Sequence, residues 1–275
     1  MDMNFDGKTV IITGASAGVG AACARAFASL KANLVLGARG QGGLNIISDE
    51  LSEYCRILTV AMDVADTDGC ITLLEKANKE FGQIDVLVNN AGMHSRGDLE
   101  SIDATDVGAM VDINLRAPFI LSCAAIPYLK KSVSGAIVMV GSLAGMAPLQ
   151  GAATYSGTKS GLRAFTYAIS DELRDTGIHV GLVSPGPIDT GFIMTEIDKV
   201  EDIVFSQPMS NTKEVADAIV RIAKGDAVEI TMPASSGKLV TLSYLFPALR
   251  RLLRPTLYKK GRKNKDKYRN RSFSN

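Results

Sequence analysis

The stretch TGASAGVG, residues 13–20, joins an apolar run to a helical pattern that begins AACARAFA. Gly14, Gly18 and Gly20 lie where a tight turn, a close approach to a pyrophosphate and close helix packing each exclude a Cβ atom. The start of the following helix offers free N–H groups and a positive dipole end to a phosphate. A structural turn can carry the same glycines, so the loop predicts a dinucleotide site only if it joins a strand to a helix in a parallel sheet.

Short apolar runs and helical patterns alternate along the chain, which is the order that such a sheet requires. The runs are continuous rather than alternating in polarity, as is typical of strands covered on both faces. We therefore predict an α/β fold with a doubly wound parallel sheet, the Rossmann fold, in one catalytic domain over residues 1–235. The predicted strands are 8–13, 33–38, 56–63, 84–92, 135–142, 179–186 and 228–233, and the helical patterns lie near 18–30, 67–81, 103–131, 153–176 and 212–224.

The composition is that of a globular protein. The 275 residues are 46% hydrophobic, which is enough apolar material for one large core. Four cysteines and two histidines are scattered without the spacing of metal ligands, so we expect reduced thiols and no metal site. The amino-terminal segment MDMNFDGK has no apolar h-region, which predicts a cytoplasmic protein.

The second predicted strand ends in Gly37-Ala38-Arg39, without an acid. Dinucleotide folds commonly place a carboxylate there for the ribose 2′-hydroxyl of NAD, whereas a cation suits the 2′-phosphate of NADP. The guanidinium of Arg39 offers a planar charged fork to a phosphate, although a solvated surface arginine has the same sequence. This position favours NADP(H) over NAD(H).

Over about residues 6 to 233 the chain resembles the short-chain dehydrogenase/reductase family in its compact single-domain form. The resemblance rests on several motifs that occur in order and with family-like spacing. It implies an oxidoreductase that acts on CH–OH groups and interconverts a carbonyl and a primary or secondary alcohol. The motifs are TGASAGVG, Asp63-Val64, NNAG at 89–92, Asn114, Ser142, Tyr155 with Lys159, and PGPIDT at 185–190.

The resemblance implies that Asn114, Ser142, Tyr155 and Lys159 are catalytic. Hydride transfer to a carbonyl leaves an alkoxide, which Tyr155 can protonate while Ser142 orients the substrate oxygen. Lys159 shares a helical face with Tyr155, so its ammonium would lower the pKa of the phenol and also hold the ribose hydroxyls. Pro118 has no N–H for the carbonyl of Asn114, which leaves that carbonyl free to hold a water in a proton relay.

The same resemblance implies the contacts with the cofactor. Asp63 and Val64 would lie near the adenine, with a turn or helix cap as the alternative role of the Asp63 carboxylate. The 90–92 segment would lie beneath the ribose, and Ile188 and Thr190 would meet the nicotinamide carboxamide. The implied set is Gly14, Ser16, Gly18, Val19, Gly20, Arg39, Asp63, Val64, Asn90, Ala91, Gly92, Tyr155, Lys159, Pro185, Gly186, Ile188 and Thr190.

Residues 191–211 show no strong element signal, and in the family the corresponding segment covers the substrate. Its apolar side chains would form an adaptable lid, which favours a lipophilic ketone, aldehyde or alcohol as substrate. The same residues can equally be ordinary core, and we expect His94 to pack or meet solvent rather than act in catalysis. The expected lining is Phe192, Ile193, Met194, Ile197, Val204, Phe205 and Met209, together with Met93, Leu143, Met146 and Leu149.

Other readings of the chain remain open. A dinucleotide-sensing or scaffold protein of the same fold has little reason to keep four catalytic residue types. An epimerase or dehydratase does not suit the glycine spacing or the lack of a large second domain. An NAD-dependent alcohol dehydrogenase is the alternative for the cofactor. The resemblance also implies a homodimer or homotetramer that pairs through the helices at 103–131 and 153–176.

Residues 236–275 join an apolar arm to a basic tail. From Arg250 onward there are 11 lysines and arginines against one acid, Asp266. The apolar stretch is too short to span a bilayer, so the arm predicts peripheral association with an anionic membrane surface. The alternative is an arm that packs on the body or a partner subunit near the substrate entrance, with a solvated and disordered basic end. No element that reads bases is present, so we expect no nucleic-acid binding.

The leucines of the arm recur near helical spacing, and Pro247 would restart the helix. They are Leu239, Leu242, Leu245, Leu249, Leu252 and Leu253.

Overall fold

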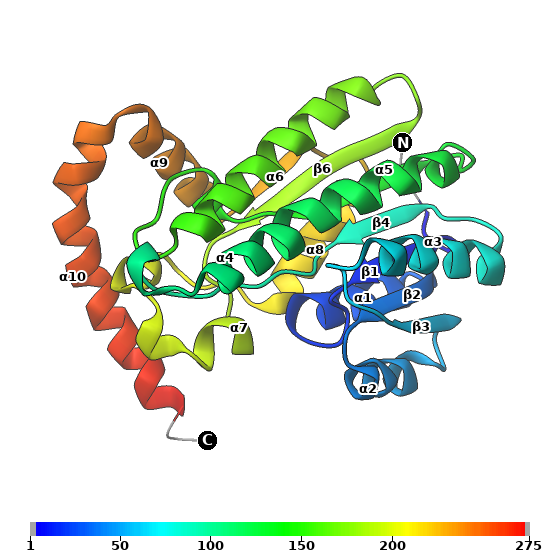
Figure 1. Ribbon diagram of the computed structural model, residues 1–275, viewed down its shortest axis with the longest axis horizontal. Helices are drawn as coiled ribbons and strands as arrows, with labels where there is room; N and C mark the ends of the chain where they lie inside the picture. The colour runs from blue at the N-terminus through cyan, green and yellow to red at the C-terminus, as the bar shows by residue number, and fades with distance from the viewer. Residues whose placement is uncertain (1–3, 273–275) are drawn as a thin grey trace.

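The computed structural model describes residues 4–272 and contains a seven-stranded parallel sheet in the order β3-β2-β1-β4-β5-β6-β7 (Figure 1). The order reverses between β1 and β4, so a crevice opens at the carboxyl ends of these two strands, where doubly wound folds bind ligands. The predicted fold class is confirmed. The strands are β1 (Thr9–Thr13), β2 (Asn33–Ala38), β3 (Ile57–Ala61), β4 (Val86–Asn89), β5 (Gly135–Val140), β6 (Ile178–Pro185) and β7 (Glu229–Met232).

Helices cover both faces of the sheet and divide the core in two. Successive side chains of a strand point to opposite faces. Val10 of β1 therefore packs in one cluster with Phe27, while Ile11 packs in the other with Leu73. Burial on both sides explains why the strands are continuously apolar. The first face carries α1 (Gly18–Ser29), α2 (Gln41–Leu51) and α8 (Thr212–Ala223), and the second carries α3 (Thr67–Phe81), α5 (Ala117–Leu129) and α6 (Ala153–Glu172).

The helix α2 was missing from the sequence prediction. It begins QGGLNI, and its two early glycines weaken any helix signal. Leu44, Ile47 and Leu51 are nevertheless buried at helical spacing. Packing of these three side chains on the first core outweighs the poor local propensity.

The predicted helix at 103–131 is interrupted at the position of Asn114. It consists of α4 (Ala104–Val111), one π turn (Asp112–Arg116) and α5. The N–H of Ala117 reaches the carbonyl of Asp112, and the next residue, Pro118, has no N–H to give. The run Ala104–Leu129 is the one described helical stretch with the length and hydropathy of a membrane span, but α5 packs on β4, β5 and α3.

The segment that was expected to form a lid contains only short elements. They are α7 (Gly191–Met194) and two 3-10 turns, Ile197–Lys199 and Asp202–Ser206. Ile193, Val200 and Phe205 form a small core of their own, against which Tyr268 of the chain end packs. We call residues 190–211 the lid.

Two helices follow the sheet, α9 (Ala234–Leu245) and α10 (Pro247–Ser272), and we call them the tail helices. Pro247 is the first residue of α10, as expected. Figure 1 shows α10 at one edge of the molecule, beside the segment that carries α7. The basic end is helical as far as Ser272 rather than disordered, although most of its cations are exposed, and the helix packs on the lid, as the alternative of an arm on the body expected. The last three residues of the predicted tail, 273–275, lie outside the part of the chain that the structure describes.

Candidate active site

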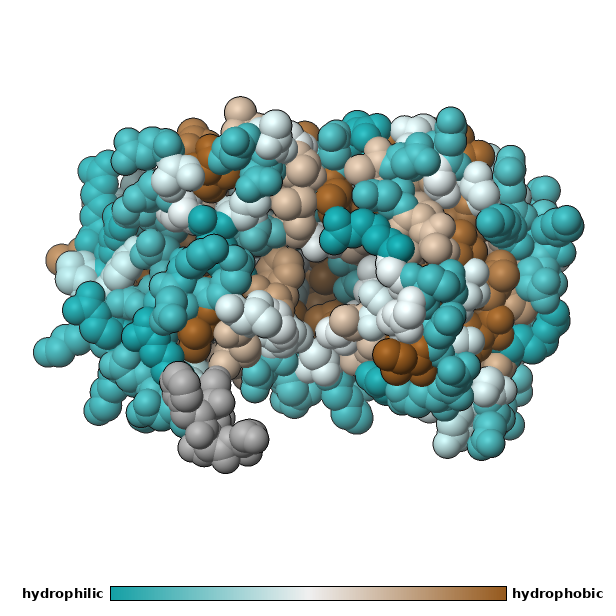
Figure 2. All heavy atoms as spheres, turned by 60° about the horizontal axis from the view of Figure 1, so that its bottom comes forward, coloured by the Kyte–Doolittle hydropathy of each residue, from teal (hydrophilic) through white to brown (hydrophobic). Residues whose placement is uncertain are grey.

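One cavity of about 1420 Å³ runs from the glycine loop to the tail helices. Figure 2 shows a hollow with apolar residues in its depth, between the side that carries α10 and the rest of the body. The cavity brings together most of the residues predicted for the site. Its lining includes Gly14, Gly18, Val19, Gly20, Asn90, Ala91, Gly92, Ser142, Tyr155, Lys159, Pro185, Gly186, Ile188 and Thr190.

The glycine loop forms a cradle that side chains would fill. Gly14 and Gly18 have φ angles of +65° and +54°, which favour glycine. A Cβ atom on Gly20 would lie 2.1 Å from the carbonyl oxygen of Gly14. The helix α1 starts at Gly18, and its first N–H groups have no side-chain cap within the described residues. This cradle fits the pyrophosphate of a dinucleotide.

The NNAG segment after β4 holds this cradle in place. The side-chain amide of Asn90 donates to the carbonyl of Thr13 at 2.8 Å. The backbone N–H groups of Asn90 and Ala91 both donate to the Thr13 hydroxyl at 3.0 Å. Asn90 thus ties together the loops that follow the two strands at the crevice, a role that the sequence did not predict.

Asn114 lies behind the cavity wall and is fully buried. Its side chain accepts a hydrogen bond from the N–H of Met93 and donates one to the carbonyl of Met93, both at 2.8 Å. A Cβ atom on Gly92 would lie 3.3 Å from the Asn114 side-chain oxygen. The side chain therefore positions the backbone after NNAG, and only the main-chain carbonyl is left for a relay.

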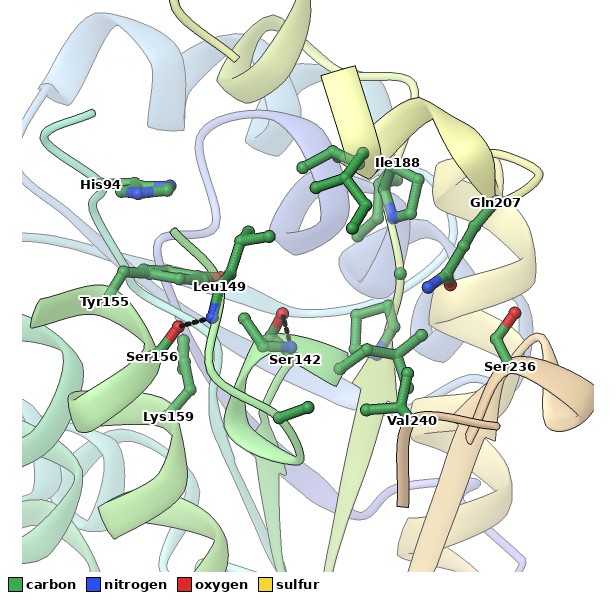
Figure 3. Close-up of a pocket in the computed structure, with 18 of the residues that line it drawn as sticks. His94, Ser142, Leu149, Tyr155, Ser156, Lys159, Ile188, Gln207, Ser236 and Val240 are labelled. Carbon is green, nitrogen blue, oxygen red and sulfur yellow. Dashed lines mark hydrogen bonds between the residues drawn. The ribbon is translucent and has the colours of Figure 1, made fainter. Parts of the chain in front are cut away.

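Tyr155 and Lys159 come from α6, and Ser142 follows β5 (Figure 3). The Nζ atom of Lys159 donates to the carbonyl of Val140 at 2.8 Å and lies 5.8 Å from the centre of the Tyr155 ring. The Ser142 hydroxyl accepts from the N–H of Ala144 at 3.1 Å, so its own proton is available to a partner in the cavity.

The pKa values of these groups depend mainly on burial. Burial raises the pKa of Tyr155, against a hydrogen bond from Ser142 and the charge of Arg96, which both lower it. Burial also lowers the pKa of Lys159 to about 8, so this amine can exchange a proton near neutral pH. Arg96 is thus a cation that favours the phenolate and that helical spacing did not indicate, while the effect of Lys159 on the phenol stays a prediction.

His94 lies directly over the proposed proton donor (Figure 3). Its ring stacks on that of Tyr155 with 4.3 Å between centroids and 13° between planes. Burial and then the charge of Arg96 lower the pKa of His94 to about 3, so the ring is neutral. Arg96 can only donate to Nδ1, at 2.9 Å, which places the remaining proton on Nε2. That N–H is buried without a partner among the described residues, in a residue that lines the cavity.

Arg96 is a functional residue that sequence reasoning missed. Its guanidinium donates to the carbonyl of Phe192 at 2.7 Å and lies 3.7 Å from the carboxylate of Glu196. Both partners belong to the lid, so Arg96 joins the lid to the catalytic pocket. The available signal was a histidine and an arginine immediately after NNAG.

Five predicted residues lie outside the cavity lining. Asn114 lies behind it, and Val64 has its side chain in the second core. One oxygen of Asp63 accepts from the N–H of Ala65 at 2.9 Å, which is the turn role that the sequence left open. Ser16 lies on the glycine loop next to α2, and Arg39 is exposed just beyond β2.

The apolar wall differs from the expected one. Phe205, Met194, Ile197 and Met209 belong to the small core beneath α10 and do not line the cavity, nor do Met93 and Met146. The four lid residues among these pack under the tail helix, which covers this part of the lid. Of the expected set, Phe192, Ile193, Val204, Leu143 and Leu149 line the cavity, and the tail helices add Leu239, Val240, Leu253 and Leu257.

Comparison with known proteins agrees with this geometry. The family model described as short chain dehydrogenase matches residues 8–202. The 3-oxoacyl-acyl-carrier-protein reductase FabG of Escherichia coli is 32% identical over 233 residues, which are 83% of this chain and 95% of that protein. The NADP-dependent 3-hydroxy acid dehydrogenase of Schizosaccharomyces pombe is 33% identical over 224 residues, 78% of this chain and 86% of that protein.

Solved structures give the same result. A short-chain type dehydrogenase/reductase from Mycobacterium marinum superposes with a TM-score of 0.76 at 26% identity, covering 83% of this chain and 94% of that one. A metagenomic short-chain oxidoreductase in complex with NADP superposes with a TM-score of 0.71 at 28% identity, covering 83% and 98%. With the cradle, the crevice and the Ser142, Tyr155 and Lys159 cluster, these matches show that the chain belongs to the short-chain dehydrogenase/reductase family.

Proposed function

We propose that this oxidoreductase interconverts a carbonyl and an alcohol on a lipophilic substrate with NADP(H) as cofactor. The observation that carries the proposal is one cavity with the glycine cradle at one end and an apolar wall at the other. Ser142, Tyr155 and Lys159 lie between the two. The test is the loss of NADPH absorbance with ketones and aldehydes graded by chain length and ring size. Turnover that is indifferent to chain length would contradict the lipophilic substrate.

The nicotinamide ring, when bound, supplies or accepts the hydride. Tyr155 gives its phenolic proton to the oxygen that becomes the alcohol, and Ser142 donates a hydrogen bond that orients this oxygen. Lys159, with a pKa of about 8, returns a proton to the phenol. The backbone carbonyl of Asn114 would hold the water that supplies Lys159.

The proposed contacts with NADP(H) comprise the full set implied by the sequence, including Asp63, Val64 and Arg39. Two similar proteins support NADP(H) rather than NAD(H) as the cofactor. One is named NADP-dependent, and the other was solved in complex with NADP. Within the described residues Arg39 is exposed and has no acidic partner, so its guanidinium is available to a 2′-phosphate.

We expect Arg39→Leu to weaken NADPH binding by about ten- to a hundredfold and NADH binding little. Losing a charged hydrogen bond typically costs about 1.5–3 kcal/mol, which corresponds to that factor. Fluorescence titration of both cofactors measures it, and the exposed Arg174→Leu, just after the end of α6, is the control. Native protein that binds NADH as tightly as NADPH would contradict the prediction.

We expect Arg96→Gln to move the pH dependence of alcohol oxidation upward. Arg96 lowers the pKa of Tyr155, so its loss raises that pKa, and the phenolate needed as base forms only at higher pH. The measurement is kcat against pH for oxidation, where the half-maximal rate should shift to higher pH. Arg96→Lys, which keeps the charge, should retain more of the native profile. An unchanged profile in Arg96→Gln would contradict the electrostatic role.

We also propose peripheral association with anionic membranes, which would bring the enzyme to lipophilic substrates. The corner between α9 and α10 supports this, because Leu245, Phe246 and Leu252 are exposed there beside the basic residues. The double variant Leu245→Ser and Phe246→Ser should lose co-sedimentation with anionic vesicles, and salt should weaken the binding of native protein. Native protein that stays in solution with anionic vesicles at low salt would refute this.

The division into a catalytic domain (1–235) and a tail (236–275), and pairing of subunits through the 103–131 and 153–176 helices, remain predictions. Exposed Val111 and Tyr167 on those helices are compatible with such pairing.

A further inference from the structure

The cations of the tail helices fall into two groups with different surroundings. Those near the chain end hold α10 on the lid. Arg262 and Lys265 pair with Asp202 at 2.9 and 3.3 Å, and Arg269 pairs with Asp198. These ion pairs involve three of the cations in the second half of the helix.

Four other cations of α10 line the cavity instead. Arg250, Arg251, Arg254 and Lys260 are all part of its wall. No acidic side chain of the described residues lies within ion-pair distance of any of them. Arg254 donates to the hydroxyl of Tyr258 at 3.4 Å and lies 5.2 Å from its ring centre, and that hydroxyl in turn donates to the Glu201 carboxylate at 3.0 Å. This wall of the cavity therefore carries four cations without a direct ion-pair partner among the described residues.

The position of these arginines on α10 shows that they are not simply on its solvent face. Arg250, Arg254, Tyr258, Gly261 and Lys265 recur every three or four residues, so they share one face of the helix. Gly261 and Lys265 on that face are buried against the lid. The same face, about two to four turns earlier, carries Arg250 and Arg254, which line the cavity, Arg250 half-buried and Arg254 exposed.

Apolar residues line the same cavity as this charge and the reacting groups. Leu239, Val240, Leu253 and Leu257 of the tail helices line the cavity together with Leu149 and Val204. A ligand that satisfies both surfaces is an amphiphile, with an apolar chain and an anionic end. Arginine binds carboxylates and phosphates through paired hydrogen bonds, which suits either kind of anion.

We propose that Arg250 and Arg254, with Arg251 and Lys260 at the rim, bind a carboxylate or phosphate at the far end of a lipophilic carbonyl substrate. This inference rests on the proposed function for the identity of the reacting end. The tail helices lie beyond residues 8–202, so the matched family region does not supply this wall. The tail then selects substrates by charge, while Tyr155 and its neighbours carry out the reaction.

The test is calorimetric binding of decyl phosphate, decanoate and decanol to NADPH-loaded protein, each below its micelle concentration. Binding needs no turnover, so its outcome is independent of whether the reaction proposed above is correct. We expect the two anions to bind native protein more tightly than decanol. The double variant Arg250→Gln and Arg254→Gln should weaken the anions by about ten- to a hundredfold and leave decanol and NADPH binding unchanged.

The matched control is Lys263→Gln with Lys267→Gln, which removes the same charge from exposed positions of α10 outside this cavity. It should leave anion binding nearly native. The proposal is overturned if decanol binds as tightly as decyl phosphate, or if both double variants weaken the anions equally. It is also overturned if anionic vesicles bind the protein while decyl phosphate does not, because the arginines would then serve a membrane surface. A preference for phosphate over decanoate would identify the anion.

Discussion

Replacing Tyr155 by phenylalanine is expected to lower kcat by about two to four orders of magnitude, the usual contribution of a positioned general acid. The change removes only the phenolic oxygen, so the ring that stacks under His94 remains. NADPH affinity should stay nearly unchanged, because the glycine cradle and Asn90 are untouched. Stopped-flow or steady-state NADPH oxidation measures the first effect, and fluorescence titration measures the second.

Two further variants show whether this effect belongs to the proton donor. Tyr167→Phe lies on the same helix but outside the cavity, where its hydroxyl donates to Glu229 at 2.7 Å, and it should keep native kcat. Lys159→Ala should lower both kcat and NADPH affinity, since this amine serves the proton and the ribose. If Tyr155→Phe kept more than a few per cent of kcat, Tyr155 would not be the acid.

The sheet and the cradle could be predicted because their signals are local. A strand buried on both faces must be continuously apolar, and the apolar runs matched all seven strands in order. Gly20 must be glycine because the Gly14 carbonyl lies against it, and this requirement is visible in the loop sequence. Where local propensity and packing disagree, as in the glycine-rich start of α2, the pattern alone was insufficient.

The electrostatics of the site could not be predicted in the same way. Helical spacing placed Lys159 beside Tyr155 correctly, but it does not show that Nζ is engaged by the Val140 carbonyl. The influence of Arg96 depends on a loop folding back over α6 and on contacts with Phe192 and Glu196, nearly a hundred residues away. Such long-range contacts leave no periodic pattern in the sequence.

The tail shows the same limit of local patterns. Leucine spacing predicted a helix restarted at Pro247, and the structure contains that helix. The basic run after it could equally be solvated, because lysine and arginine are ordinary surface residues. What decides its packing is the pair of acids in the lid, Asp198 and Asp202, some sixty residues earlier in the chain.

The lid and α10 are joined by one buried cation, Lys265. Its Nζ atom donates to the carbonyls of Val200 and Asp198 at 2.6 and 3.3 Å and lies 3.3 Å from the Asp202 carboxylate. Without Lys265 the Asp202 carboxylate keeps Arg262 at 2.9 Å, but the carbonyls of Val200 and Asp198 lose this donor. Each buried acceptor left without a partner costs about 1–3 kcal/mol, so the ratio of docked to undocked tail should fall by about one order of magnitude or more.

We therefore expect Lys265→Met to release α10 from the lid. Trypsin should cleave the tail helix much faster than in native protein, and KM for a lipophilic substrate should rise by about tenfold or more as the outer wall is lost. KM for NADPH should stay native, since the cradle lies at the other end of the cavity.

Lys267→Met, an exposed change two residues away, is the control and should behave as native protein. Gly261→Leu should have the same effect as Lys265→Met by a different route, because a Cβ atom there would lie 1.8 Å from the carbonyl oxygen of Asp202. If Lys265→Met frees the tail to trypsin while the substrate KM stays native, α10 packs on the lid without forming part of the substrate site, and selection by the tail is ruled out.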